Sequence, residues 1–150
     1  METDAVTIRM MRTDDLDGVM DVEHASFSTA WTREAFYQEL IKNRFAHYFI
    51  AETTERIIGY CGLWVIHGDS HITNIAVHPD YRRRGVGEGL LEAVMGMAVT
   101  LAADTLSLEV RVSNEAAQKM YRKFGFENGG IRRGYYTDNQ EDALVMWVKL

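Results

Sequence analysis

The chain has 150 residues, 47% of them hydrophobic and 25% charged, which suits one globular domain with a core of its own. A formal net charge of −6 argues against general nucleic-acid binding and favours basic partners. A single cysteine, Cys61, excludes an intrachain disulfide and a cysteine-rich metal site, and with no signal peptide and no apolar run of the roughly 20 residues that a membrane span needs, we expect a soluble cytoplasmic protein.

Hydrophobic periodicity and turn residues predict strands and helices along the whole chain. The first helix is expected to start at Thr13, whose hydroxyl can cap it and which precedes two acids, and the second at Thr32. In chain order, the expected elements are a strand at 6–11, helices at 13–26 and from 32, strands at 46–53, 57–67 and 70–78, a helix at 86–101, a strand at 106–112, a helix at 114–125, and a closing antiparallel pair at 126–136 and 143–150.

This order, βααβββαβαββ, is typical of an α+β sandwich in which helices cover a mixed sheet. The chain contains no internal repeat, low-complexity tract or linker. We therefore expect a single domain over residues 1–150.

The stretch HPDYRRRGVGEGLLEA, residues 78–93, concentrates positive charge and glycines before an amphipathic helix. A solvated basic loop would explain only the arginines. A dinucleotide-binding fingerprint fails because Leu90 stands where its third glycine belongs. An anion-binding site explains both features, because bare main-chain N–H groups at a helix start bind pyrophosphate and guanidinium groups add hydrogen bonds. The same guanidinium groups are suited to a ribose 3′-phosphate.

A strand ending in NIAVHPDY, followed by RRRGVG and an amphipathic helix, resembles the acetyl-CoA signature of the GNAT acetyltransferases. The placement strengthens the resemblance, because a later strand and helix end in Tyr-x-x-x-Gly-Phe, and the similarity covers nearly the whole chain. It implies the GNAT fold, with a mostly antiparallel sheet of about seven strands, and acetyl-CoA as co-substrate.

The resemblance also implies where acetyl-CoA binds. The strand before the arginines is expected to carry a bulge and splay from its neighbour, leaving main-chain groups free to pair with the pantetheine arm. By residues alone, that strand is simply a buried one. The expected coenzyme-binding residues are Ile75, Ala76, Val77, Arg82, Arg83, Arg84, Gly85, Val86, Gly87, Glu88 and Asn114. For Asn114, helix capping is the simpler expectation.

Three further stretches, FSTAWTREAF, LEVRVSNEAAQKMY and IRRGYYTDNQEDALVM, are similar to the GNAT branch that acetylates the N-terminal alanine of ribosomal protein S18. The implied partner is therefore the N-terminal peptide of that protein, and Asp138, Glu141 and Asp142 are candidate contacts for a basic peptide. Ala30 and Thr137 stand where this branch often has proline, and both lie in expected substrate loops.

The resemblance assigns catalysis to two residues. Glu109 would remove the proton of the attacking amine, Tyr121 would protonate the leaving thiolate, and the Val77 N–H would hold the oxyanion. Both side chains have structural interpretations as well: Glu109 can pair with Arg111 on the same side of its strand, and Tyr121 lies on an apolar helix stripe typical of a core.

Several remaining residues are expected to have no direct chemical role. The five histidines show neither metal-ligand spacing nor a nucleophile partner, so we predict no metal, and Cys61 is expected to be a small buried hydrophobe. Transfer should then be direct, in a ternary complex. Trp31, Tyr135 and Tyr136 either line a peptide groove or pack against each other.

Three alternatives to the expected function stay open. The acceptor could be a small amine such as a polyamine or an aminoglycoside. The chain could bind coenzyme A without turnover, as a sensor. RNA binding through residues 82–84 is disfavoured by the acidic total charge.

Overall fold

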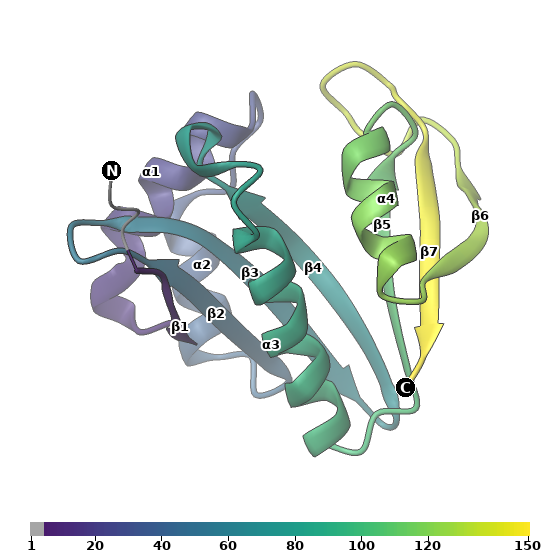
Figure 1. Cartoon of the computed structure of the whole chain (residues 1–150), viewed down its shortest axis with the longest axis horizontal. Coiled ribbons are helices and arrows are strands. Elements are labelled where there is room, and N and C mark those ends of the chain that lie inside the picture. The colour runs from purple at the N-terminus through teal and green to yellow at the C-terminus, as the bar shows by residue number, and fades with distance from the viewer. Residues whose placement is uncertain (1–4) are drawn as a thin grey trace.

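A seven-stranded sheet with the strand order β1-β2-β3-β4-β5-β7-β6 forms the centre of the molecule (Figure 1). The structure, a computed structural model, describes residues 5–150. Strands β4 and β5 are parallel, and the other neighbouring pairs are antiparallel. The expected mixed, mostly antiparallel sheet is therefore confirmed.

The elements follow the order expected from the sequence, with two short 3-10 turns added. They are β1 (Thr7–Met10), a 3-10 turn (Thr13–Asp15), α1 (Leu16–Ser26), α2 (Arg33–Ile41), β2 (Ala46–Glu52), β3 (Ile57–Ile66), β4 (Asp69–Val77), a 3-10 turn (Pro79–Tyr81), α3 (Val86–Thr100), β5 (Thr105–Arg111), α4 (Glu115–Lys123), β6 (Glu127–Arg132) and β7 (Ala143–Lys149).

Helix starts show where local signals succeed and where they do not. The Thr32 hydroxyl accepts a hydrogen bond from the Ala35 N–H at 3.1 Å and caps α2 as expected. The start expected at Thr13 is wrong, because α1 begins at Leu16. The Asp15 carboxylate accepts the Arg12 N–H at 2.7 Å, and this contact closes a 3-10 turn ahead of the helix.

Each face of the sheet carries its own hydrophobic cluster. Helices α3 and α4 cover one face, and α1 and α2 lie behind the other (Figure 1). On α3, the side chains of Leu90, Leu91 and Val94 are fully buried, each contributing roughly 1.5–3 kcal/mol of hydrophobic free energy. The alternation along β5 sends Leu106, Leu108 and Val110 toward α3 and α4, which turns Glu109 toward the α1/α2 face.

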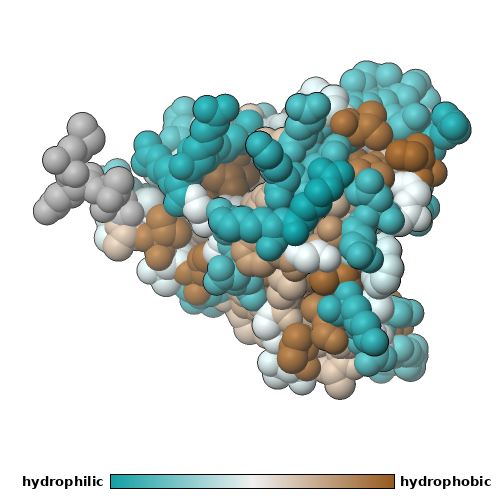
Figure 2. All heavy atoms as spheres, turned by 45° about the vertical axis from the view of Figure 1, so that its right-hand side comes forward, coloured by the Kyte–Doolittle hydropathy of each residue, from teal (hydrophilic) through white to brown (hydrophobic). Residues whose placement is uncertain are grey.

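The surface does not present a single broad apolar area on the side drawn in Figure 2, where hydrophobic patches are separated by long hydrophilic side chains. Within residues 5–150, no helix has the length and apolar character needed to cross a bilayer.

Candidate active site

The site begins where β4 and β5 separate. The two strands pair only over Asp69–His71 and Thr105–Ser107, and beyond that point they diverge (Figure 1). On the other side of β4 the register against β3 shifts, because Gly62 is opposite Asn74 while Leu63 is opposite Ile72. Thr73 is the extra residue of this bulge. The bulge and the splay expected for this strand are both present.

The splay leaves specific main-chain groups of β4 facing the gap. The His78 N–H bonds to the Ile58 carbonyl at 2.7 Å, and antiparallel bonding alternates, so the main-chain groups of Ala76 face β3 while those of Ile75 and Val77 face β5. The Val77 carbonyl accepts a hydrogen bond from Arg82 Nε at 3.0 Å. Of the main-chain groups expected to bind acetyl-CoA, those of Ile75 and the N–H of Val77 therefore face the gap, while those of Ala76 face β3.

The N-terminus of α3 lies at the open end of this gap. Gly85 caps the helix in the left-handed conformation, with φ +78°, and a Cβ placed on it would meet nothing within 4 Å. The first intrahelical bond runs from the Gly89 N–H to the Gly85 carbonyl at 3.0 Å, so the N–H groups of Val86, Gly87 and Glu88 have no helical partner. These groups and the helix dipole fit a pyrophosphate.

The three arginines differ in their surroundings. Arg82 is held against β4 by its bond to Val77, and the Arg84 guanidinium lies 5.2 Å from the ring centre of Tyr81. Arg83 is exposed and has φ +64°, a conformation uncommon for a residue with a Cβ. Arg83 and Arg84 are therefore the arginines whose side chains are available to phosphate oxygens.

Two further residues expected to contact coenzyme have partners within the chain. The Glu88 carboxylate binds Lys123 of α4 at 2.7 Å, which leaves the Glu88 N–H as the group suited to phosphate. The Asn114 side chain accepts the Ala117 N–H at 3.1 Å, so the expected capping of α4 is confirmed.

Glu109 lies two residues beyond Ser107, the last residue of β5 that pairs with β4, and donors surround its carboxylate. Its Oε1 lies 2.8 Å from His71 Nε2, and its Oε2 lies 3.5 Å from Arg132 Nε. Burial alone would raise the pKa of Glu109, but the hydrogen bond and charge of His71, together with Arg132, lower it below its ordinary value. These partners therefore favour the ionised form of the carboxylate.

The pairing of Glu109 with Arg111 that remained open from the sequence does not occur. Arg111 binds Asp138 at 2.9 Å and Glu141 at 3.2 Å, and its guanidinium lies 4.0 Å from the ring centre of Tyr136. Asp138 and Glu141, expected as contacts for a basic peptide, are thus engaged by an arginine of the same chain. This set of contacts ties the β6–β7 loop to β5.

Tyr121 lies on the opposite side of β5 from Glu109. Its ring is 3% exposed and packs in the cluster that holds Leu108 and Val110, with the Phe126 ring centre 5.6 Å away. Burial raises the pKa of the Tyr121 hydroxyl, so it remains protonated and able to donate. The base and acid candidates therefore lie on opposite faces of β5.

Cys61 is fully buried, as expected from the sequence. Burial raises the pKa of its thiol, which keeps it in the unreactive protonated form.

A buried network on the α1/α2 face was not anticipated from the sequence. The Glu23 carboxylate, 2% exposed, accepts hydrogen bonds from the Tyr60 hydroxyl and from the Trp31 N–H, and Asn74 donates to the same hydroxyl at 3.2 Å. From the sequence, Glu23 would be taken for an ordinary exposed helix residue. The only signal of another role is its position four residues before the loop that begins at Phe27. The network ties the α1–α2 loop, through Trp31, to α1 and to strands β3 and β4.

The loops that follow α1 and β6 meet over this face. The Ser28 hydroxyl donates to Asp138 at 3.1 Å, which joins the two loops. The Trp31 ring packs on Phe36, with ring centres 5.2 Å apart, and the rings of Tyr135 and Tyr136 pack edge to face at 5.1 Å. Tyr135 and Tyr136 therefore pack against each other, whereas Trp31 packs on α2. A role for the three in lining a peptide groove stays a prediction.

Residues 5–150 hold no group of three or more histidine, cysteine or acidic side chains arranged for a metal ion. The site is therefore built from a carboxylate with its donors, a buried phenol, free strand amides and a helix N-terminus.

Comparisons with known proteins agree with this geometry. The model of the acetyltransferase (GNAT) family matches residues 16–126. The chain is 48% identical over 150 residues to a Bacillus subtilis (strain 168) protein with a provisional name as a ribosomal protein bS18-alanine N-acetyltransferase, covering 100% of this chain and 99% of that one. It is 34% identical over 144 residues to the Escherichia coli (strain K12) ribosomal protein bS18-alanine N-acetyltransferase, covering 93% and 95%.

Two solved structures resemble this chain along nearly its whole length. The crystal structure of the Escherichia coli ribosomal-protein-S18-alanine N-acetyltransferase has a TM-score of 0.88 and 32% identity, covering 97% of this chain and 94% of that one. Ard1 from Thermoplasma volcanium, at 24% identity and a TM-score of 0.87 with coverage of 97% and 98%, shares the fold.

Proposed function

This chain belongs to the GNAT acetyltransferase family and is an N-acetyltransferase, and we propose that it transfers the acetyl group of acetyl-CoA to the N-terminal alanine of ribosomal protein bS18. The full-length identity to proteins named for that reaction supports this acceptor.

One structural observation carries the proposal: where β4 and β5 stop pairing, the two faces of the sheet present different chemistry. On the α3/α4 face, the unpaired N–H groups at the start of α3 and the exposed Arg83 and Arg84 suit the phosphates of acetyl-CoA. On the α1/α2 face, Glu109 suits an incoming amine. The arrangement supports direct transfer through the gap.

Acetyl-CoA supplies an activated thioester, and the residues of the chain handle the protons. Glu109 takes one proton from the α-ammonium group, directly or through one water, and an α-amine with an ordinary pKa of about 7.7–8.0 needs only a modest base. The Val77 N–H, which faces the gap, donates to the carbonyl oxygen as negative charge develops there. As the new C–N bond forms and the C–S bond breaks, Tyr121 donates its proton to the leaving sulfur, and the second proton lost by the nitrogen restores the phenol.

The acidic total charge of the chain complements a basic acceptor peptide. Asp138 and Glu141 contribute little to that complementarity, because Arg111 already binds both. Their role is to shape the loop beside the acceptor face.

The test is an acetylation assay of the purified full chain with acetyl-CoA and a peptide of the bS18 N-terminus. Mass spectrometry should find one acetyl group, on the α-amine of the alanine. The same peptide with a blocked α-amine should not react, and spermidine and an aminoglycoside should react far more slowly. Reaction of the small amines alone would overturn the proposed acceptor.

A further inference from the structure

His71 makes the nearest contact to the proposed base. It is the last residue of β4 that pairs with β5, where it lies opposite Ser107, and its side chain reaches Glu109 two residues further along. The Nε2–Oε1 distance is 2.8 Å. Since an ionised carboxylate can only accept, Nε2 carries the hydrogen of this bond. This side-chain contact joins β4 to β5 immediately beyond their last main-chain pair.

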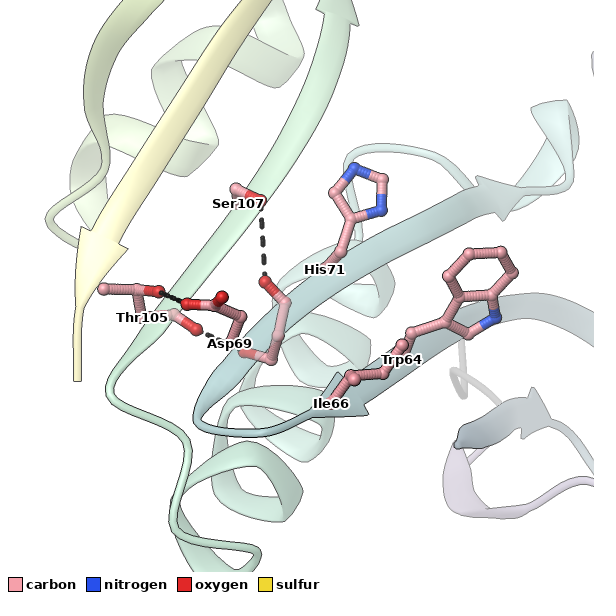
Figure 3. Close-up of a pocket in the computed structure, with 7 residues that line it drawn as sticks. Trp64, Ile66, Asp69, His71, Thr105 and Ser107 are labelled. Carbon is pink, nitrogen blue, oxygen red and sulfur yellow. Dashed lines mark hydrogen bonds between the residues drawn. The ribbon is translucent and has the colours of Figure 1, made fainter. Parts of the chain in front are cut away.

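The residues that line the hollow beside His71 do not compete with Glu109 for its ring. His71 lies at the edge of a hollow of about 260 Å³ on the α1/α2 face, where Figure 3 shows its ring rising beside Ser107. The hollow is lined by Trp64, Ile66, Asp69, Ser70, His71, Thr105 and Ser107. Asp69, the acid among them, accepts a hydrogen bond from the Thr105 hydroxyl at 3.3 Å, so the hydrogen bond of His71 goes to Glu109.

The other partners of Glu109 hold it less firmly. Arg132 lies 3.5 Å from Oε2 and its side chain is 60% exposed. A hydrogen bond from Tyr135 also lowers the pKa of Glu109, but Tyr135 is 45% exposed in the β6–β7 loop. His71 projects from a central strand whose main chain is paired on both sides at that residue. Of the groups that face the carboxylate, His71 therefore has the most rigid anchor.

We propose that His71 is a positioning residue for acetyl transfer, which holds Oε1 of Glu109 so that Oε2 faces the acceptor amine. The inference rests on the proposed function, because it takes Glu109 as the base. A carboxylate free to rotate would spend less time aligned with the amine, and alignment is a large part of general-base catalysis. A glutamine at this position keeps an N–H donor of similar reach, whereas an alanine removes it.

The experiment compares steady-state kinetics of H71A, H71Q, E109Q and the double variant H71A/E109Q with the wild-type chain. We expect kcat to fall about 10-fold in H71A, part of the roughly 10²–10⁴-fold that a general base contributes, with the KM for acetyl-CoA unchanged. H71Q should recover to within about 3-fold of wild type because it restores the donor. E109Q should lose most activity, and H71A should lower it no further, because residues acting as a unit are not additive.

Ser107→Ala is the matched control, since Ser107 lines the same hollow opposite His71 and its hydroxyl donates to the Ser70 carbonyl rather than to Glu109. It should leave kcat near the wild-type value. A readout that does not need turnover is the pKa of Glu109, followed by NMR on protein with ¹³C-labelled glutamate. That pKa should rise in H71A, because the variant loses a partner that lowers it.

Failure of the inference and failure of the proposed function look different. Wild-type kcat in H71A, an H71Q as slow as H71A, or an H71A effect that persists in the E109Q background would each overturn the role of His71. An E109Q variant that keeps full activity would instead overturn Glu109 as the base. If another amine proves to be the acceptor, the same comparison applies with that amine.

Discussion

At the scale of single residues, the proposed mechanism gives two ionisable groups opposite tasks. Glu109 must be ionised to accept a proton, and its partners His71 and Arg132 favour the ionised form. Tyr121 must be neutral to donate, and its burial favours the neutral form. The same physical variable, the local environment of the charge, therefore sets both roles.

Tyr121→Phe removes only the hydroxyl and should lower kcat about 100-fold, the scale of one acid–base group. The KM for acetyl-CoA should change little, because the ring keeps its packing against Phe126. Steady-state kinetics check both values, and wild-type kcat in the variant would exclude Tyr121 as the acid.

The raised pKa of Tyr121 also predicts the shape of the pH profile. In the wild-type chain, kcat should show no fall up to about pH 10, the ordinary pKa of tyrosine, since the folded phenol loses its proton only above that value. A basic limb near pH 8 would show that a different group supplies the proton.

At the scale of elements, two short segments decide the geometry of the site: the turn into α3 and the β6–β7 loop. The turn needs a residue at positive φ to aim the first N–H groups of the helix at the gap. The loop needs Arg111, which binds two of its acids and stacks on Tyr136.

Gly85→Ala should destabilise the turn into α3, because alanine at φ +78° costs about 1 kcal/mol. The cost is conformational, since the added Cβ meets no atom within 4 Å. We expect the Tm to fall by about 2–4 °C and acetyl-CoA to bind more weakly, measured by thermal melting and calorimetric titration. An unchanged affinity would show that the turn does not contact the phosphates.

Arg111→Gln should loosen the β6–β7 loop and act on the acceptor rather than on the coenzyme. The variant loses both ion pairs and the contact with Tyr136, so the KM for the acceptor peptide should rise several-fold while that for acetyl-CoA stays constant. Hydrogen exchange of residues 133–142 should become faster. Equal changes in both KM values would contradict this assignment.

At the scale of the whole molecule, the α1/α2 face, where the proposed acceptor would bind, depends on how the N-terminal elements attach to the sheet. Arg9 of β1 binds Asp15 at 2.8 Å and Glu52 of β2 at 2.8 Å, which joins the start of α1 to two strands. The Asp15 side chain is 7% exposed and that of Glu52 is 29% exposed, so the Arg9–Asp15 contact is the better shielded of the two. The hydrogen bond from Arg9 lowers the pKa of Asp15, against the opposing effect of burial.

The sign of this shift predicts how stability depends on acid. Asp15 stabilises the folded chain fully above its unfolded pKa of about 3.9, and this contribution disappears as the pH falls through the lower folded value. Asp15→Asn should therefore reduce the free energy of unfolding by about 2 kcal/mol at pH 7 and by much less at pH 2. Urea unfolding at both pH values measures the difference, and an equal loss at both would show that the charge is not responsible.

Local patterns determined much of this protein. Apolar spacing predicted the order of strands and helices, since an amphipathic element must turn one side to the core whatever its neighbours are. Residues 78–93 indicated a phosphate site, because glycines and a helix start present free N–H groups without help from distant residues. The family resemblance pointed to Glu109 and Tyr121, whose roles remain predictions, and the alternation along β5 correctly turned Glu109 away from the core.

Tertiary structure alone decided which side chains meet. Arg111 was a reasonable partner for Glu109 from the sequence, yet residues two apart on a strand lie about 7 Å from each other, while side chains on neighbouring strands approach within about 5 Å. His71 reaches Glu109 across 38 positions of sequence only because β4 and β5 pair in one register before they diverge. Contacts between distant residues depend on strand register, and register is a property of the assembled sheet.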